Sequence, residues 1–172
     1  MPTSPTSPTS PTSWKINPEP VTDAAVDAVM RQYFTEMGQR VLGRTVADAE
    51  IRAVLAKDPH RDLTPPNGQF LVARGDGNQF LGCVGLRLLD GAPGTAELKR
   101  MYVHPAGRGA GLGRGLLLAA EEAARRLGAE RMVCETNTQL TEARSLYTRY
   151  GYEETEPYEG HGRADRWYAK EM

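Results

Sequence analysis

Apolar residues recur at three- and four-residue steps once the chain has passed residue 21. One such stripe contains Val26, Val29, Met30, Tyr33, Phe34 and Met37. The spacing predicts an amphipathic helix of about 16 residues, which Thr22 is suited to cap and Gly38 to end. A second helix is predicted over about 46–57, because the Asp-Pro sequence at 58–59 stops the pattern.

The pattern then changes to one typical of strands. Two apolar runs, at 69–74 and 79–89, flank the sequence GDGN, which is a hairpin-turn signature. A third run at 95–103 follows the turn sequence DGAPG. Three consecutive strands are therefore expected to form an antiparallel meander.

Helices and strands alternate in the second half of the chain. A Leu/Ala stripe predicts a helix over about 111–127 that stops at Gly128. A strand at 130–137, a helix at 141–150 and two final strands follow. The order α-α-β-β-β-α-β-α-β-β indicates an α/β (α+β) fold, with a mixed, mainly antiparallel sheet and helices on both sides. The 103–130 unit should be a right-handed parallel crossover.

A length of 172 residues suits one domain with an appendage. Residues 2–13 are four copies of Pro-Thr-Ser and offer no apolar face to bury. Residues 1–20 are therefore expected to form a disordered or extended tail, and residues 21–172 the folded domain.

Charge and cysteine usage narrow the class of protein. Lys and Arg number 21 against 22 Asp and Glu, so no global field favours nucleic acid or a membrane. The N-terminus lacks the pattern of a signal peptide, and Cys83 and Cys134 form no CxxC pair. These features predict a cytoplasmic protein. The three histidines show no metal-ligand spacing, so no metal is expected.

Residues 107–117, GRGAGLGRGLL, place five glycines and two arginines between a predicted strand and a predicted helix. A dinucleotide fingerprint fails on spacing, because its third glycine would fall on Arg114 or Leu116. A triphosphate loop fails because the stretch holds no lysine. Two interpretations remain: a mobile turn, or a cradle of backbone N–H groups for an anion at a helix N-terminus. The flanking arginines favour the cradle.

The sequences AELKRMYVHPAGRGAGLGRGLL and EARSLYTRYGY resemble motifs of the GNAT superfamily of acetyl-CoA-dependent N-acetyltransferases. The resemblance extends in element order over about residues 20–172. It implies a GNAT-like fold, in which strands 95–103 and 130–137 splay around acyl-CoA, and no metal. The backbone of Met101, Tyr102 and Val103 would pair with the pantetheine arm. The coenzyme A pyrophosphate would be held by Arg108, Gly109, Ala110, Gly111, Leu112, Gly113 and Arg114.

The resemblance also suggests catalytic residues. Glu97 lies 11 residues before Arg108, where a subset of the family has a catalytic glutamate, and is the candidate base, acting directly or through a water. Its alternative role is an ion pair with Lys99 or Arg100. Tyr147 matches the tyrosine near the coenzyme sulfur and is the candidate acid, although its position on an apolar helical face also suits a core residue.

One position departs from the family pattern. The family's asparagine, seven residues before that tyrosine, is replaced here by Leu140, and Asn137 is the substitute candidate for contacting the coenzyme.

The implied activity is acetyl transfer from acetyl-CoA to a primary amine of a small molecule, by direct attack in a ternary complex. A protein or peptide N-acetyltransferase and a non-catalytic acyl-CoA-binding module remain alternatives. The acceptor is expected near residues 37–44 and the acidic sequence YEETEPYEG. The glutamates of that sequence, at 153, 154, 156 and 159, suit a cationic amine or simply a solvated edge. A homodimer is common among proteins that look like this one.

Overall fold

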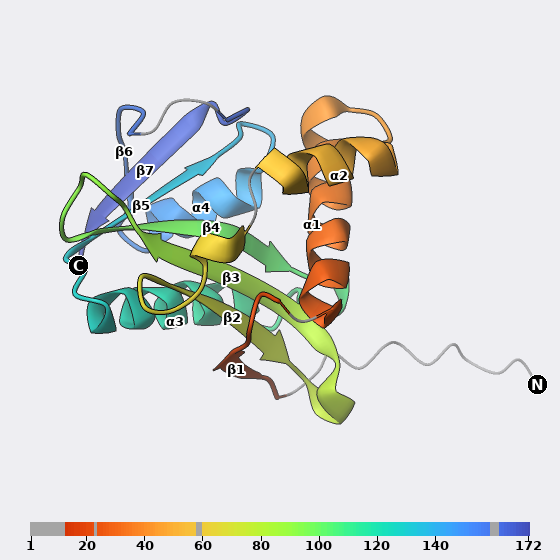
Figure 1. The fold of residues 1–172 in the computed structure, drawn as a ribbon, viewed down its shortest axis with the longest axis horizontal. Helices are drawn as coiled ribbons and strands as arrows, with labels where there is room; N and C mark the ends of the chain where they lie inside the picture. Colours follow the sequence, from red (N-terminus) through yellow and green to blue (C-terminus); the bar gives the residue numbers. More distant parts are fainter. Residues whose placement is uncertain (1–12, 23, 58–59, 159–161) are drawn as a thin grey trace, which may run out of the picture.

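The computed structural model describes residues 13–22, 24–57, 60–158 and 162–172. These residues form a seven-stranded sheet in the order β1-β2-β3-β4-β5-β7-β6, with helices on both faces (Figure 1). The elements follow in the order β1 (Lys15–Pro18), α1 (Ala24–Leu42), α2 (Asp48–Lys57), η1 (His60–Asp62), β2 (Gly68–Arg74), η2 (Asp76–Asn78), β3 (Phe80–Leu88), β4 (Thr95–Val103), η3 (Pro105–Gly107), α3 (Leu112–Arg126), β5 (Arg131–Thr136), α4 (Thr141–Arg149), β6 (Glu153–Glu154) and β7 (Arg166–Glu171).

The mixed, mainly antiparallel sheet predicted from the sequence is confirmed. Strands β2, β3 and β4 form the antiparallel meander, and η2 makes the expected turn between β2 and β3. Strands β4 and β5, which α3 connects, are the parallel pair. The remaining neighbours β5, β7 and β6 pair antiparallel.

Each face of the sheet has its own core. On one face α3 buries Leu112, Leu116 and Leu117 against the central strands, and Tyr147 of α4 joins them. On the other face α1 buries Val26 and Met30. Strand β3 lies between the two cores, which explains why six consecutive residues of it are buried.

Both cysteines, Cys83 and Cys134, lie in these cores as free thiols. Burial raises the pKa of each thiol well above its usual range.

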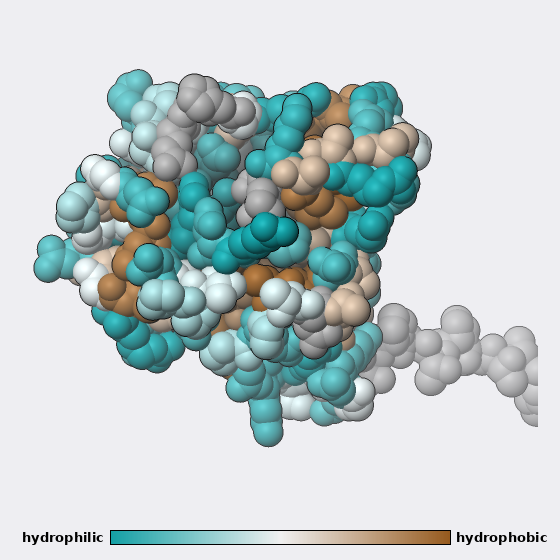
Figure 2. All heavy atoms as spheres, viewed as in Figure 1, coloured by the Kyte–Doolittle hydropathy of each residue, from teal (hydrophilic) through white to brown (hydrophobic). Residues whose placement is uncertain are grey.

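Figure 2 shows that hydrophilic residues dominate the viewed surface and that apolar residues form only small separate areas on it. None of the helices in the described part of the chain is both long and apolar enough to cross a membrane.

The expected end of the first helix was wrong. Helix α1 runs past Gly38 to Leu42. A Cβ at Gly38 would lie 2.6 Å from Cγ2 of Val46, so this glycine allows the α1–α2 connection to pack closely and does not end the helix. The second helix begins at Asp48, two residues later than predicted.

Strand β1 was not predicted, and it lies within the segment that the sequence assigned to the tail. It pairs antiparallel with the edge of β2, from Lys15 opposite Arg74 to Pro18 opposite Leu71. Residues 15–18, which the sequence assigned to the tail, therefore belong to the sheet. The remainder of the predicted tail, residues 1–12, lies outside the described residues.

Candidate functional site

The site is built on the separation of two neighbouring parallel strands. Pairing between β4 and β5 runs from Thr95–Arg131 to Leu98–Cys134 and then stops, although β4 continues to Val103. Between Cys83 and Gly85 the register with β3 shifts, so β4 holds one residue more than its partner there. Arg100, with φ of 56°, lies in this bulge. The bulge accompanies the divergence of β4, and the predicted splay is present.

A cavity of about 760 Å³ occupies the space between the separated strands. Its wall comes from β4, the glycine-rich loop, the end of β5, α4 and the second half of α1. Every binding or catalytic residue predicted from the sequence contributes to this wall except Glu97 and Ala110. The structure therefore brings residues from four separate segments of the chain to one place.

The glycine-rich loop meets the cavity where α3 begins. Gly111 is the N-cap of α3 and, with φ of 71°, adopts a left-handed conformation that favours glycine. No side chain caps the first N–H groups of the helix. A Cβ at Gly111 would meet nothing within 4 Å, so the space above the loop is open. Open space in front of uncapped helix N–H groups fits an anionic group such as a pyrophosphate.

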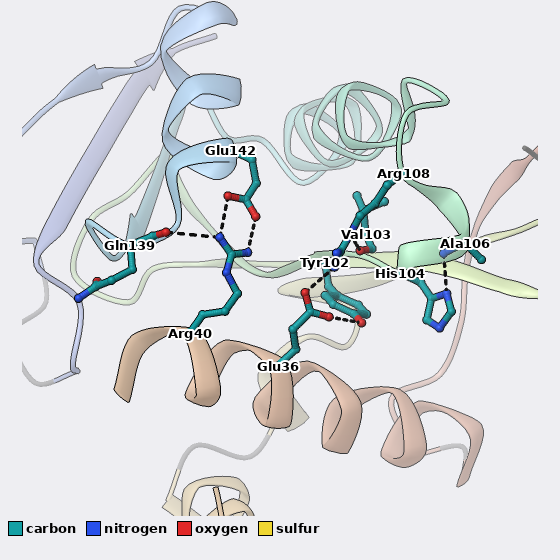
Figure 3. Close-up of polar contacts among 9 residues, drawn as sticks. All are labelled: Glu36, Arg40, Tyr102, Val103, His104, Ala106, Arg108, Gln139 and Glu142. Atoms are coloured by element: carbon teal, nitrogen blue, oxygen red, sulfur yellow. Dashed lines mark hydrogen bonds and ion pairs between the residues drawn. The ribbon is translucent and has the colours of Figure 1, made fainter. Parts of the chain in front are cut away.

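The arginines that flank the loop make different contacts. Arg114 places its guanidinium 5.9 Å from the ring centre of Tyr150 on the edge of α4. Arg108 donates from Nε to the carbonyl oxygen of Val103, 3.1 Å away, and its guanidinium pairs with Glu36 of α1. The Tyr102 hydroxyl donates to the same Glu36 carboxylate at 2.8 Å (Figure 3). Arg108 thus connects the end of β4 to α1.

A second ion pair on α1 lies one helical turn further on. Arg40 pairs with Glu142 of α4 and donates to the carbonyl oxygen of Gln139 at 3.4 Å (Figure 3). The hydrogen bond from Arg40 holds the pKa of the Glu142 carboxyl below its usual value. Both residues line the cavity, so the pair joins α1 to α4 at its wall.

Tyr147 forms part of the cavity wall, although it is only 3 % exposed to solvent. Its ring packs 5.6 Å from that of Tyr152 and 5.8 Å from that of Tyr168. Burial, followed by the neighbouring Cys134 thiol, raises the pKa of the phenol well above its usual value. The proton therefore stays on the phenol throughout the working pH range. The core and acid interpretations of this residue are compatible.

Glu97, the candidate base, does not line the cavity. Its carboxylate is buried, pairs with Nε of Arg87 directly opposite on β3 at 2.8 Å, and accepts a hydrogen bond from the Tyr158 hydroxyl at 3.1 Å. Arg87 in turn pairs with Asp62 at 3.2 Å. The geometry favours an ion-pair role with Arg87, a partner that sequence spacing did not suggest because it lies on a different strand.

Asn137 lines the cavity as expected, and its amide donates to the carbonyl oxygen of Arg163 at 2.5 Å. Its side chain therefore also holds the segment before β7 in place. None of the described residues of the acidic sequence, 152–158, lines the cavity, and Glu153 and Glu154 form β6. Residue 159 lies outside the described residues. Met37 and Arg40, from the expected acceptor region, do contribute.

Six charged residues of the cavity wall were not among the residues predicted for the site: Lys99, Arg100, Glu135, Glu142, Arg149 and Arg163. Arg100 is 8 % exposed, and its guanidinium lies 4.8 Å from the ring centre of Phe34 on α1. Its direction depends on the bulge in β4, for which the sequence carries no periodic signal. Glu135 is the first residue of β5 beyond the last parallel pair, so its position could be recognised only from the register.

Comparisons with known proteins agree with this geometry. Residues 26–152 match the sequence model of the Acetyltransferase (GNAT) family. An uncharacterised N-acetyltransferase of Schizosaccharomyces pombe is 35% identical over 130 residues, which cover 76% of each chain. An aminoalkylphosphonate N-acetyltransferase of Salmonella typhimurium is 33% identical over 97 residues, covering 55% of this chain and 62% of its own. A Salmonella typhimurium acetyltransferase solved with its cofactor acetyl-CoA is 25% identical, with a TM-score of 0.60 over 92% of this chain and 93% of its own.

Substitution of Glu97 by Gln tests the assignment of that residue. We expect Glu97→Gln to lower the free energy of unfolding by about 1–3 kcal/mol, because Arg87 would lose a buried counter-charge. Urea denaturation measures this difference. Asp62→Asn is the matched control, since Asp62 pairs with the same arginine but its side chain is 67% exposed. Unchanged stability together with loss of the acidic limb of the pH–rate profile would instead support the base role.

Proposed function

Because the chain belongs to the GNAT acetyltransferase family and is an acetyl-CoA-dependent N-acetyltransferase, we propose that it acetylates a primary amine of a small molecule. The amine would attack the acetyl thioester directly while both substrates are bound. The cysteine usage agrees with a reducing, cytoplasmic setting for this reaction.

The observation that carries the proposal is the shape of the cavity. It follows β4 past its last pair with β5 and ends at the uncapped start of α3. An extended chain carrying amide groups at one end and a pyrophosphate at the other fits such a slot. The backbone of Met101, Tyr102 and Val103 would pair with the pantetheine arm as an added strand does. The pyrophosphate would lie against the loop from Arg108 to Arg114.

Acetyl transfer to an amine requires two proton movements. A primary amine has a pKa near that of lysine, about 10.4, so it must lose a proton before its nitrogen can attack the carbonyl carbon. When the carbon–sulfur bond breaks, the departing sulfur takes up a proton. Tyr147 would supply it, because its phenol lines the cavity and stays protonated.

Glu97 is less well placed to take the proton from the acceptor amine. Since this carboxylate lies behind the cavity wall, it could reach the amine only through an intervening water. Two described carboxylates line the wall, those of Glu135 and Glu142. The ion pair with Arg40 lowers the pKa of Glu142 and so weakens it as a base, which leaves Glu135 as the other carboxylate in the cavity. Most of the rate is expected from holding the amine and the thioester together.

The size of the acceptor is inferred from the relatives and the cavity. One relative is named as acting on aminoalkylphosphonates, which are small amines. The ion pair between Arg40 and Glu142 joins α1 to α4 at the cavity wall, which suits a small acceptor better than an extended peptide.

A panel of amines with acetyl-CoA tests the function as a whole. We expect acetyl-CoA to raise the melting temperature, since a ligand that binds only the folded state at 100 times its Kd adds about 2.7 kcal/mol of stability. Thiol release should follow with at least one small amine. Binding without turnover on any amine would favour a non-catalytic module, and turnover on peptides alone would favour a protein N-acetyltransferase.

Replacing Tyr147 by Phe removes the proton donor and keeps the ring. We expect kcat to fall by about 100-fold or more, while the unfolding free energy changes little, because the packing against Tyr152 and Tyr168 remains. The position of the alkaline limb of the pH–rate profile should not move, since the Tyr147 phenol is protonated throughout. A kcat equal to that of the wild type would contradict the acid role.

Gly113→Ala tests the backbone cradle. Gly113 lies in the first turn of α3, and its added Cβ would make only ordinary contacts, the nearest being 3.6 Å from Leu146. We expect retained stability but a Kd for coenzyme A raised by about tenfold or more, because the methyl group would hold phosphate oxygens away from the N–H groups. Gly77→Ala, at the β2–β3 turn with φ of 63°, is the control that should alter stability without altering affinity. Unchanged affinity in Gly113→Ala would show that the loop is only a turn.

A further inference from the structure

A short segment just before β1 crosses from the edge of the sheet to the start of α3. Contacts hold this segment on each side of residue 14. Before it, the Ser13 hydroxyl donates to the Asp76 carboxylate at 3.2 Å. After it, Lys15 lies opposite Arg74 in the strand pairing of β1 with β2. Trp14 lies between these two attachments and packs against the core beneath α3. None of the proposed catalytic or coenzyme-binding residues belongs to this segment.

Trp14 makes two contacts with the glycine-rich loop and the helix that follows it. Its indole Nε1 donates to the carbonyl oxygen of Ala110 at 3.3 Å. Its ring covers Gly115 so closely that a Cβ there would lie 2.4 Å from Cη2 and 2.9 Å from Cζ3. Gly111 and Gly113 lie between these two contacts along the chain, and both line the cavity. The indole therefore contacts the loop and the first turn of α3 on either side of the two cavity-lining glycines.

The hydrogen bond to Ala110 has a directional consequence. The carbonyl of Ala110 and the N–H of Gly111 belong to the same peptide unit. In a planar trans peptide these two groups point in opposite directions. Holding the Ala110 carbonyl on the indole thus turns the Gly111 N–H away from Trp14. Ala110 does not line the cavity, whereas Gly111 does, which agrees with this orientation.

We propose that Trp14 is a positioning residue for the coenzyme pyrophosphate, acting through the peptide between Ala110 and Gly111. The indole fixes the direction of one N–H donor, and its ring fixes the first turn of α3 that supplies the others. This inference rests on the proposed function, in which that loop holds the pyrophosphate. It also gives Gly115 a separate reason to be glycine: space for the indole ring.

The first experiment measures coenzyme A binding by calorimetry, which requires no amine acceptor. Trp14→Phe keeps an aromatic ring over Gly115 and removes the N–H donor, and it should raise the Kd for coenzyme A by about five- to tenfold. Trp14→Ala should raise it further. Ser13→Ala, which removes only the neighbouring contact to Asp76, is the control and should bind as the wild type does. A wild-type Kd in Trp14→Phe would overturn the proposal, even where Trp14→Ala fails to fold.

The second experiment separates positioning from general damage. S-acetylpantetheine carries the thioester and the amide arm but no pyrophosphate. Trp14→Phe should therefore raise the KM for acetyl-CoA while leaving kcat unchanged, and should leave kcat/KM for S-acetylpantetheine at the wild-type value. An equal loss with both donors would overturn the proposal. If no amine is acetylated by the wild type, the proposed function fails, while the calorimetric result still decides the role of Trp14.

A reciprocal substitution checks the contact with the helix. Gly115→Ala in the wild-type background forces the ring aside and should raise the Kd for coenzyme A, as Trp14→Ala does. In the Trp14→Ala background, where the ring is gone, the same Gly115→Ala change should leave the Kd unaltered. Equal effects in the two backgrounds would show that Gly115 and Trp14 act independently and would contradict the proposed contact.

Discussion

The separation of β4 from β5 beyond the Leu98–Cys134 pair is the constraint on which the rest of the site depends. Buried backbone N–H and C=O groups require partners, and a strand that leaves its neighbour gives up those partners along one edge. Strand β3 keeps the other edge of β4 paired as far as Val103. The result is a strand that stays fixed in place while one row of its polar groups faces a cavity. Such an edge is suited to bind an extended chain that carries amides.

Helix α1 is held over this opening in two different ways. Its first half is anchored by apolar burial of Val26, Val29 and Met30. Its second half is connected to the rest of the protein by Glu36 and Arg40, which pair with the glycine-rich loop and with α4 (Figure 3). Ionic screening does not weaken apolar burial, whereas it does weaken partly exposed ion pairs. The two ion pairs are thus the part of the α1 attachment that added salt would weaken, and they lie at the cavity.

The sequence predicted well what depends on local pattern. The stripes of α3 and α4, the meander of β2 to β4 and the loop at Gly109 to Gly113 all follow from periodicity, turn residues and spacing. It predicted poorly what depends on register between strands. Glu97 faces Arg87 because of how β4 aligns with β3, and Arg100 faces α1 because of a bulge.

Residues whose role depends on close packing in three dimensions were also not predicted from the sequence. Gly38 resembles a helix stop because its packing partner, Val46, is visible only in three dimensions. Strand β1 was overlooked because four residues ending in proline carry little pattern, and its pairing with β2 supplies the order. Both edge strands of the sheet are short: β1 has four residues and ends at Pro18, and β6 consists of two glutamates. Short, proline-ended or charged edge strands are poor templates for strand addition, so this sheet is protected against pairing edge to edge with other copies.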